Sequence, residues 1–145
     1  MNNLIISDCR EQNLEKIYEL EINNSYNPWT KKMFMDEFAN KSSFFKIANF
    51  QNNIIGFIIY RINIDEAEIM NLVIDAHCRN NGFGEKLLLY AVEDIKLLCA
   101  NKIFLEVRDS NKAAIKLYTK NGFKKYNIRK NYYTVEDALL MKKIL

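Results

Sequence analysis

Several residue types are scarce in this chain of 145 residues, and each scarcity excludes a class of protein. The three cysteines, Cys9, Cys78 and Cys99, are an odd number without a Cys-x-x-Cys pair. This excludes a disulfide framework and a zinc ribbon, and it fits free thiols in a reducing compartment. His77 is the only histidine, so a catalytic histidine pair and a multi-histidine metal site are excluded, and we expect no metal. One proline and four glycines exclude a collagen-like chain or a proline-rich linker.

Long apolar runs are also missing. No run approaches the roughly 18 residues of a membrane span, and the first residues, MNNLIISDCREQ, lack a signal-peptide pattern. We therefore expect a soluble cytoplasmic protein with no membrane partner. The composition that remains is globular, with 49% hydrophobic, 12% aromatic and 27% charged residues. A chain of this length predicts one domain over residues 1–145.

The net charge of +3 hides an asymmetry along the chain. Residues 1–101 carry 10 basic and 14 acidic side chains, whereas residues 102–145 carry 11 basic and 4 acidic ones. Seven basic residues and no acidic residue lie from Lys112 to Lys130. This segment is either a solvated helix face or a positive field for a polyanionic ligand or for the neighbourhood of RNA. No nucleic-acid-binding motif accompanies the charge, so we expect no direct nucleic-acid recognition.

The spacing of apolar residues predicts a mixed α/β chain. The pattern predicts helices over 11–22, 30–38, 82–98 and 111–120, with Thr30 as the N-cap of the second helix. It predicts strands over 4–6, 44–50, 54–64, 68–74, 103–107, 123–133 and 138–144. This order of elements indicates a mixed sheet with helices packed on both faces.

The most informative stretch is an apolar strand followed by the loop 75–81 and by Gly82-Phe83-Gly84 at the start of a helix. The first amides of a helix lack internal partners and carry a partial positive charge, and glycine lets a phosphate approach the backbone closely. Arg79 adds a cation at the entrance. The stretch is not a Walker A loop, because Gly-Lys-[Ser/Thr] is absent, and Leu87 occupies the third glycine position of Gly-x-Gly-x-x-Gly. The motif is therefore either a phosphate cradle or a helix start with structural glycines.

Arg79-x-x-Gly82-x-Gly84, placed between an apolar strand and an amphipathic helix, resembles motif A of the GNAT acetyltransferases. The resemblance covers nearly the whole chain and is strongest to the bacterial RimI-type members, which acetylate the N-terminal alanine of a small-subunit ribosomal protein. Two departures are Ala76 and Cys78, where many relatives have a proline and an aromatic residue. The matching segments are Asn27-Pro28-Trp29-Thr30, Leu105-Glu106-Val107-Arg108, Ser110-Asn111-Lys112-Ala113-Ala114-Ile115, Leu117-Tyr118, Asn121-Gly122-Phe123, Arg129-Lys130-Asn131-Tyr132-Tyr133 and Glu136-Asp137-Ala138.

The resemblance implies a GNAT fold and acetyl-CoA as co-substrate. It implies that the backbone of Leu72-Val73-Ile74 binds the pantetheine arm, which lies beside it like an extra strand, and that an N–H of this segment polarises the thioester carbonyl. Asn111 is expected to be a helix N-cap on its sequence alone, and the resemblance adds a contact with the cofactor. The residues implied in cofactor binding are Leu72, Val73, Ile74, Arg79, Asn80, Asn81, Gly82, Phe83, Gly84, Glu85 and Asn111.

Two residues are candidates for proton transfer. Glu106 lies in an apolar strand, where burial of a lone carboxylate is costly unless a cleft or a polar partner relieves it. Its sequence leaves two roles open, a general base or a structural salt bridge with Arg108, and the resemblance implies the base. Tyr118 is either a core aromatic residue or, as the resemblance implies, the general acid that protonates the CoA thiolate. Cys78 is interpreted as a passive loop cysteine rather than a reactive thiol, and Asn71, a polar residue inside a strand, is assigned no chemistry.

The acceptor side is implied by three aromatic residues. The resemblance places Trp29, Tyr132 and Tyr133 near the acceptor peptide, whereas ordinary packing is their alternative. Together these features predict direct acetyl transfer to the N-terminal amine of a protein. Two alternatives are a GNAT enzyme acting on a small amine or a lysine, and a non-catalytic acyl-CoA-binding module.

Overall fold

The computed structural model describes residues 3–132 and 136–145. All of its strands join in one seven-stranded sheet with the order β1-β2-β3-β4-β5-β7-β6. The neighbours are antiparallel except for β4 and β5, which are parallel. The strands are β1 (Leu4–Asp8), β2 (Ser43–Phe50), β3 (Asn53–Asn63), β4 (Glu66–Ile74), β5 (Lys102–Arg108), β6 (Lys124–Arg129) and β7 (Ala138–Ile144).

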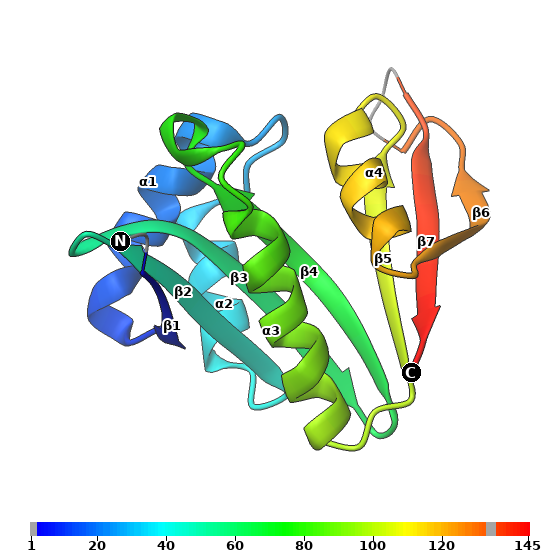
Figure 1. The fold of residues 1–145 in the computed structure, drawn as a ribbon, viewed down its shortest axis with the longest axis horizontal. Helices are drawn as coiled ribbons and strands as arrows, with labels where there is room; N and C mark the ends of the chain where they lie inside the picture. The colour runs from blue at the N-terminus through cyan, green and yellow to red at the C-terminus, as the bar shows by residue number, and fades with distance from the viewer. Residues whose placement is uncertain (1–2, 133–135) are drawn as a thin grey trace.

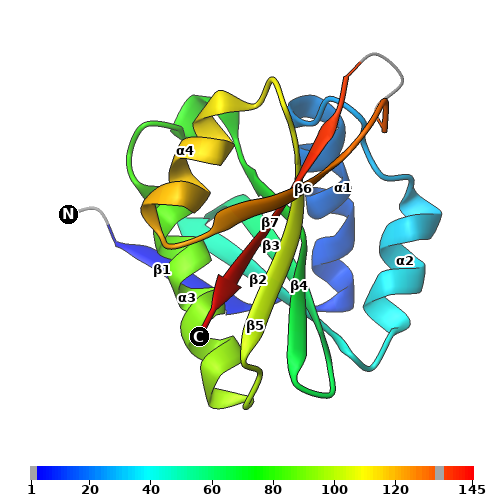
Figure 2. The same cartoon turned by 90° about the vertical axis from the view of Figure 1, so that its right-hand side faces the viewer.

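Four α-helices cover the two faces of this sheet (Figure 1, Figure 2). They are α1 (Leu14–Asn24), α2 (Lys31–Ala39), α3 (Phe83–Leu97) and α4 (Lys112–Lys120). Helices α1 and α2 lie on one face, and α3 and α4 lie on the other. None of the helices in the described ranges is long and apolar enough to cross a membrane.

The core is divided in two by the sheet. One cluster packs α3 and α4 against the sheet and contains Tyr60, Leu87 and Tyr118 among its buried residues. The other cluster packs α1 and α2 against the opposite face and contains Ile17, Phe34 and Phe57. The alternation of side chains along each strand assigns the apolar residues to the two clusters.

The sheet opens at the pair of strands that carries the site. Strand β4 pairs with β5 only over Glu66–Glu68 and 102–104, near the start of each strand. Beyond that point the two strands diverge, which Figure 1 shows as the widening space between β4 and β5. A register shift in the β3–β4 ladder, between Ile59 and Tyr60, bends β4 at the same level.

The predicted order of elements is confirmed, including a helix N-cap at Thr30, whose side chain accepts a hydrogen bond from the Met33 amide. Several boundaries differ: β1 extends to Asp8, α1 extends to Asn24 and β4 begins at Glu66. The predicted helix 11–22 begins with a short 3₁₀ turn, Glu11–Asn13, before α1. The predicted strand 123–133 ends at Arg129, because 130–132 form a turn in which Asn131 has a φ of 52°.

Candidate active site

One large groove follows the divergence of β4 and β5, with a volume of about 1330 Å³. It is lined from the α1–α2 connection, from β4 and the turn after it, from β5 and from α4. Most residues that the sequence predicted for the site line it: Trp29, Leu72, Val73, Ile74, Arg79, Asn80, Gly82, Phe83, Gly84, Glu85, Glu106, Asn111, Tyr118 and Tyr132. Asn81 does not line the groove, and Tyr133 lies outside the described residues.

The turn before α3 exposes the start of a helix to this groove. Gly82 is the N-cap residue with a φ of 77°, in the left-handed region that favours glycine. The Asn81 side chain donates hydrogen bonds to the carbonyls of Cys78 and Arg79, both at 3.1 Å, so it braces the turn from within. The backbone N–H groups at the start of α3 can donate hydrogen bonds to an anionic group.

Two charged residues of the turn have protein partners. The Arg79 Nε atom donates to the Ile74 carbonyl at 3.1 Å, which ties the loop to the end of β4. The Glu85 carboxylate accepts hydrogen bonds from Asn121 at 3.0 Å and from Lys120 at 3.2 Å. These contacts lower the pKa of Glu85 and join the first turn of α3 to the end of α4. The side chain of Glu85 thus serves the contact between the two helices.

Tyr118 is the buried member of the proposed catalytic pair. Its side chain is 8% exposed and packs edge-on against Phe123, with 5.6 Å between the ring centroids. Burial raises the pKa of the Tyr118 phenol to about 12. Among the residues that the structure describes, the hydroxyl has no hydrogen-bond partner, although Tyr118 lines the groove. The environment therefore keeps the proton on the phenol and leaves it available to a group in the groove.

Glu106 is paired with a cation from another strand. Its Oε1 atom lies 2.9 Å from Nη2 of Arg129, and its side chain is 23% exposed. The alternative partner suggested by the sequence, Arg108, is wrong, because Arg108 lies 3.5 Å from Glu136 and stacks on the ring of Tyr26 at 4.2 Å. The polar partner expected for a carboxylate in this strand is thus present, but it comes from β6.

A second carboxylate, Glu68 of β4, also lines the groove and was missed by the sequence reasoning. Burial and the nearby Glu106 both raise the pKa of Glu68. The alternation along β4 places Glu68 on the face covered by α1 and α2. The signal was present in the sequence as an acid within an apolar strand, the same signal that singled out Glu106.

Two of the predicted acceptor residues, Trp29 and Tyr132, also line the groove. The Trp29 ring packs against Phe34 with 5.1 Å between centroids. The Tyr132 ring lies 4.9 Å from the guanidinium of Arg129, the same group that pairs with Glu106. Arg129 therefore connects the candidate base to Tyr132.

Three further features of the sequence analysis can be placed in the structure: Asn111, Cys78 and the basic segment. Asn111 caps α4 by accepting a hydrogen bond from the Ala114 amide at 3.2 Å, as predicted. Burial raises the pKa of the Cys78 thiol and Asp75 raises it further, the opposite of what a reactive thiolate requires. From the basic segment, Lys116 and Lys120 line the groove.

In the described ranges, no group of three or more His, Cys, Asp and Glu side chains is placed to hold a metal ion.

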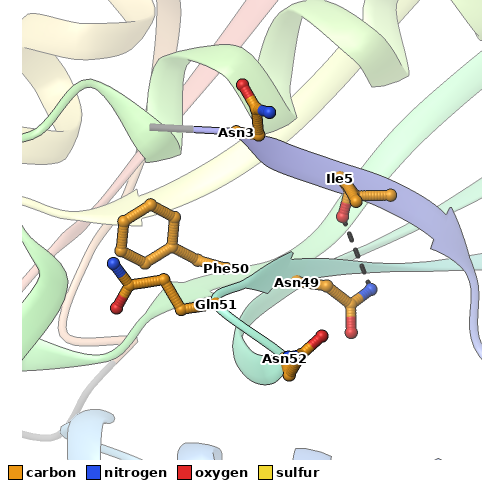
Figure 3. Close-up of a pocket in the computed structure, with 6 residues that line it drawn as sticks. All are labelled: Asn3, Ile5, Asn49, Phe50, Gln51 and Asn52. Atoms are coloured by element: carbon orange, nitrogen blue, oxygen red, sulfur yellow. Dashed lines mark hydrogen bonds between the residues drawn. The ribbon is translucent and has the colours of Figure 1, made fainter. Parts of the chain in front are cut away.

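A second hollow, of about 530 Å³, lies between β1 and the β2–β3 turn (Figure 3). Figure 3 shows the hydrogen bond from the Asn49 amide to the Ile5 carbonyl, at 3.4 Å, beside it. Its lining carries no ionisable or nucleophilic side chain: Asn3, Ile5, Asn49, Phe50, Gln51 and Asn52. The chemistry of the molecule is therefore concentrated in the large groove.

The sheet that opens between β4 and β5, the glycine turn before α3 and the groove lined by Glu106 and Tyr118 agree with the acyl-CoA-dependent transferase that the sequence predicts. Residues 14–123 match the model of the acetyltransferase (GNAT) family, and the chain belongs to that family. The fold expected from the sequence is confirmed.

Named relatives narrow the comparison. The chain is 35% identical over 134 residues to the [ribosomal protein bS18]-alanine N-acetyltransferase of Haemophilus ducreyi, with 92% of each chain covered. It is 31% identical over 140 residues to the Escherichia coli K12 enzyme of the same name, with 94% of each covered. The crystal structure of the ribosomal-protein-S18-alanine N-acetyltransferase from E. coli superposes with a TM-score of 0.93 at 29% identity, covering 98% of this chain and 94% of that one.

Proposed function

We propose that this chain transfers the acetyl group of acetyl-CoA to the N-terminal α-amine of a protein, with the N-terminal alanine of ribosomal protein bS18 as acceptor. The observation that carries the proposal is the groove itself, because one groove is lined by the glycine turn at α3, by Tyr118 and Glu106, and by Trp29 and Tyr132. The names of the relatives support the choice of acceptor. Residues 1–145 form the catalytic domain in this proposal, and a ribosomal acceptor assigns the activity to the cytoplasm.

In this proposal the α3 turn binds the pyrophosphate through backbone amides of Gly82, Phe83 and Gly84. The edge of Leu72–Ile74 that faces the groove is unpaired with β5 in the described structure, so it can accept the pantetheine arm as an added strand. An amide of this segment polarises the thioester carbonyl. Asn111 lines the groove from the start of α4 and, in this proposal, contacts the cofactor.

The proposed chemistry moves three protons. Glu106, directly or through a water molecule, accepts a proton from the acceptor ammonium, and the neutral nitrogen then forms a bond to the acetyl carbon and releases its second proton to solvent. Tyr118 donates its phenolic proton to sulfur as the carbon–sulfur bond breaks. The phenol that burial keeps protonated is suited to the second step, and the partly exposed carboxylate is suited to the first. No acetylated residue of the enzyme is needed.

The proposal is tested by mass spectrometry of peptides that begin with Ala, Ser, Met or Lys, each incubated with acetyl-CoA and the protein. We expect acetylation of the Ala peptide at its α-amine, with slower modification of the other three. Acetylation confined to lysine side chains would overturn the acceptor, and the absence of any transfer from acetyl-CoA would overturn the proposed function.

A further inference from the structure

Glu21 is the most deeply buried acidic residue in the described structure, with 1% of its surface exposed. It lies in α1 and takes no part in the proton transfers proposed above. Its Oε1 atom accepts hydrogen bonds from the Ser25 hydroxyl at 2.7 Å and from the Asn71 side-chain amide at 3.0 Å. Its Oε2 atom accepts from the Trp29 backbone amide at 2.9 Å. Burying a carboxyl group costs free energy unless it is hydrogen-bonded, and removing one of its three donors would leave a buried oxygen without a partner.

The three donors come from two different walls of the groove. Ser25 and Trp29 belong to the α1–α2 connection, which has no helix or strand of its own between 25 and 30. Asn71 belongs to β4, directly before the segment proposed to hold the pantetheine arm. A second side chain of α1, Asn24, accepts a hydrogen bond from the Ala76 amide at 2.9 Å. The last turn of α1 therefore binds the chain on both sides of Leu72–Ile74, at Asn71 of β4 and at Ala76 in the turn after it.

The two walls differ in how firmly they are held. Strand β4 pairs with β3 over Asn71–Ile74, in the middle of the sheet, so its place does not depend on Glu21. The α1–α2 connection has no strand pairing of its own, and its side-chain supports besides Glu21 include Tyr26 against Arg108 and the Trp29 ring against Phe34. If the Glu21 contacts are lost, the connection moves and the strand stays.

We propose that Glu21 is a positioning residue that fixes the acceptor wall at Trp29 against β4 through Asn71, and so sets the affinity for the acceptor peptide. The inference rests on the proposed function, because that function makes Trp29 part of the acceptor site. It also gives a role to Asn71, whose polar side chain in an apolar strand now has a partner. The hydrogen-bond partners of the Glu21 carboxylate are Ser25, Trp29 and Asn71, so in this proposal it acts on binding rather than on proton transfer.

The test exchanges the two hydrogen-bonding groups. Asn71→Asp is isosteric but places a second carboxylate 3.0 Å from that of Glu21, so the contact becomes repulsive. Adding Glu21→Gln restores a donor and an acceptor in swapped positions, since the Gln amide can donate to Asp at 71 and its oxygen can still accept from Trp29. Glu19→Gln is the matched control, because it makes the same change on the exposed side of α1.

Steady-state kinetics with the Ala peptide are the first readout. We expect Asn71→Asp to raise the KM for the peptide by about tenfold, within the range of couplings measured for contacting groups. The kcat and the acetyl-CoA affinity should stay close to wild type, the double variant should regain most of the lost affinity, and Glu19→Gln should match wild type. An unchanged peptide KM in folded Asn71→Asp, a loss confined to kcat, or no recovery in the double variant would overturn the inference.

Fluorescence gives an independent readout, because Trp29 is the only tryptophan of the chain. We expect Asn71→Asp and Glu21→Ala to make Trp29 more accessible to acrylamide at a temperature where circular dichroism shows a folded protein, and the double variant to reverse the change. A merely structural role would lower the melting temperature without this change, and that result would overturn the inference. We call the hydrogen bonds of Glu21 with Ser25, Trp29 and Asn71 the Glu21 clamp. The fluorescence measurement needs no acceptor, so it can show that the clamp is absent even if the wild-type protein proves not to have the proposed function.

Discussion

Burial separates the two residues that we propose to move protons. Tyr118 is almost excluded from water and has no counter-charge that the structure describes, whereas Glu106 is partly exposed and paired with Arg129. A phenol whose pKa is raised to about 12 stays protonated across the working range of pH. Glu106, Trp29 and Tyr132 all line the groove, and we propose that the acceptor amine binds there. The acid and the base are thus kept apart by their surroundings.

Tyr118→Phe tests the acid. The change removes the hydroxyl but keeps the ring and its contact with Phe123, so folding should be little affected. General acid catalysis contributes about 10²–10⁴-fold, and we expect kcat to fall within that range. The affinity for acetyl-CoA, measured by calorimetry, should be mostly kept. Turnover equal to that of wild type would identify Tyr118 as a core residue only.

Glu106→Gln tests the base through its dependence on pH. An α-amine has a pKa of about 7.7–8.0, so below that range it must lose a proton before it attacks. The defect of the variant should therefore be largest at low pH and smallest near pH 9, where the amine is already neutral. A ratio of wild-type to variant rates measured from pH 6 to pH 9 checks this. A defect that grows as the pH rises would contradict the assignment.

The same amine chemistry predicts which group is acetylated. A lysine side chain has a pKa of about 10.4, so at pH 7 far less of it is neutral than of an α-amine. A single carboxylate such as Glu106 is a modest base and is better matched to the α-amine. We expect a peptide with an N-terminal Ala and an internal Lys to be acetylated at its α-amine, as located by fragmentation in mass spectrometry. Preferential modification of the lysine would be inconsistent with this acceptor.

At the scale of elements, the turn at the start of α3 can hold a phosphate only if the residues there have small side chains. A Cβ added at Gly84 would lie 3.6 Å from Ile74 and 3.9 Å from Leu117, which are ordinary contact distances on the wall of the groove. Gly84→Ala should therefore fold and lose little affinity. Gly84→Val adds a branched side chain beside the proposed phosphate site, and we expect its acetyl-CoA affinity to fall strongly in calorimetry. Equal affinity in the two folded variants would refute the cradle.

The elements themselves were predictable because their signals are local. Thr30 and Asn111 cap the helices that follow them, and burial alternates strictly along the β-rich sequence of β5. The contacts that complete the site are not local. Glu21 and Asn71 lie 50 residues apart. Arg108 and Arg129 both lie opposite Ala138 of β7, so only the register of three strands decides which of them meets Glu106.

At the scale of the whole molecule, the groove exists because the two halves of the sheet meet over a short length. The β1–β4 half carries α1, α2 and α3, and the β5–β7 half carries α4 (Figure 1). The halves are parallel neighbours only at Glu66–Glu68, and the groove begins where this pairing ends. Catalytic candidates therefore come from the second half, while the cofactor turn and the Glu21 clamp belong to the first.

Three buried, weakly acidic side chains, two tyrosine phenols and one cysteine thiol, make the free energy of unfolding depend on pH. Burial raises the pKa of the Tyr118 phenol from 10.0 to about 12 and that of the Cys9 thiol from 9.0 to about 12, and it raises the pKa of Tyr60 as well. The folded state thus holds protons that the unfolded state releases first. This contribution is fully present below the unfolded pKa values and is lost as the pH rises through the folded ones. The free energy of unfolding should decline above about pH 9.

Tyr118→Phe isolates one part of this decline. Between pH 10 and pH 12 the unfolded phenol is ionised and the folded one is not, so Tyr118 should contribute up to about 1.4 kcal/mol per pH unit to the loss. The variant keeps the ring but cannot titrate at this position. Urea unfolding at a series of pH values should therefore give a shallower alkaline slope for the variant than for wild type, with parallel curves below pH 9. Equal slopes above pH 10 would show that the Tyr118 hydroxyl is as accessible to solvent in the folded protein as in the unfolded chain, and the phenol would then lack the shielding that the proposed acid requires.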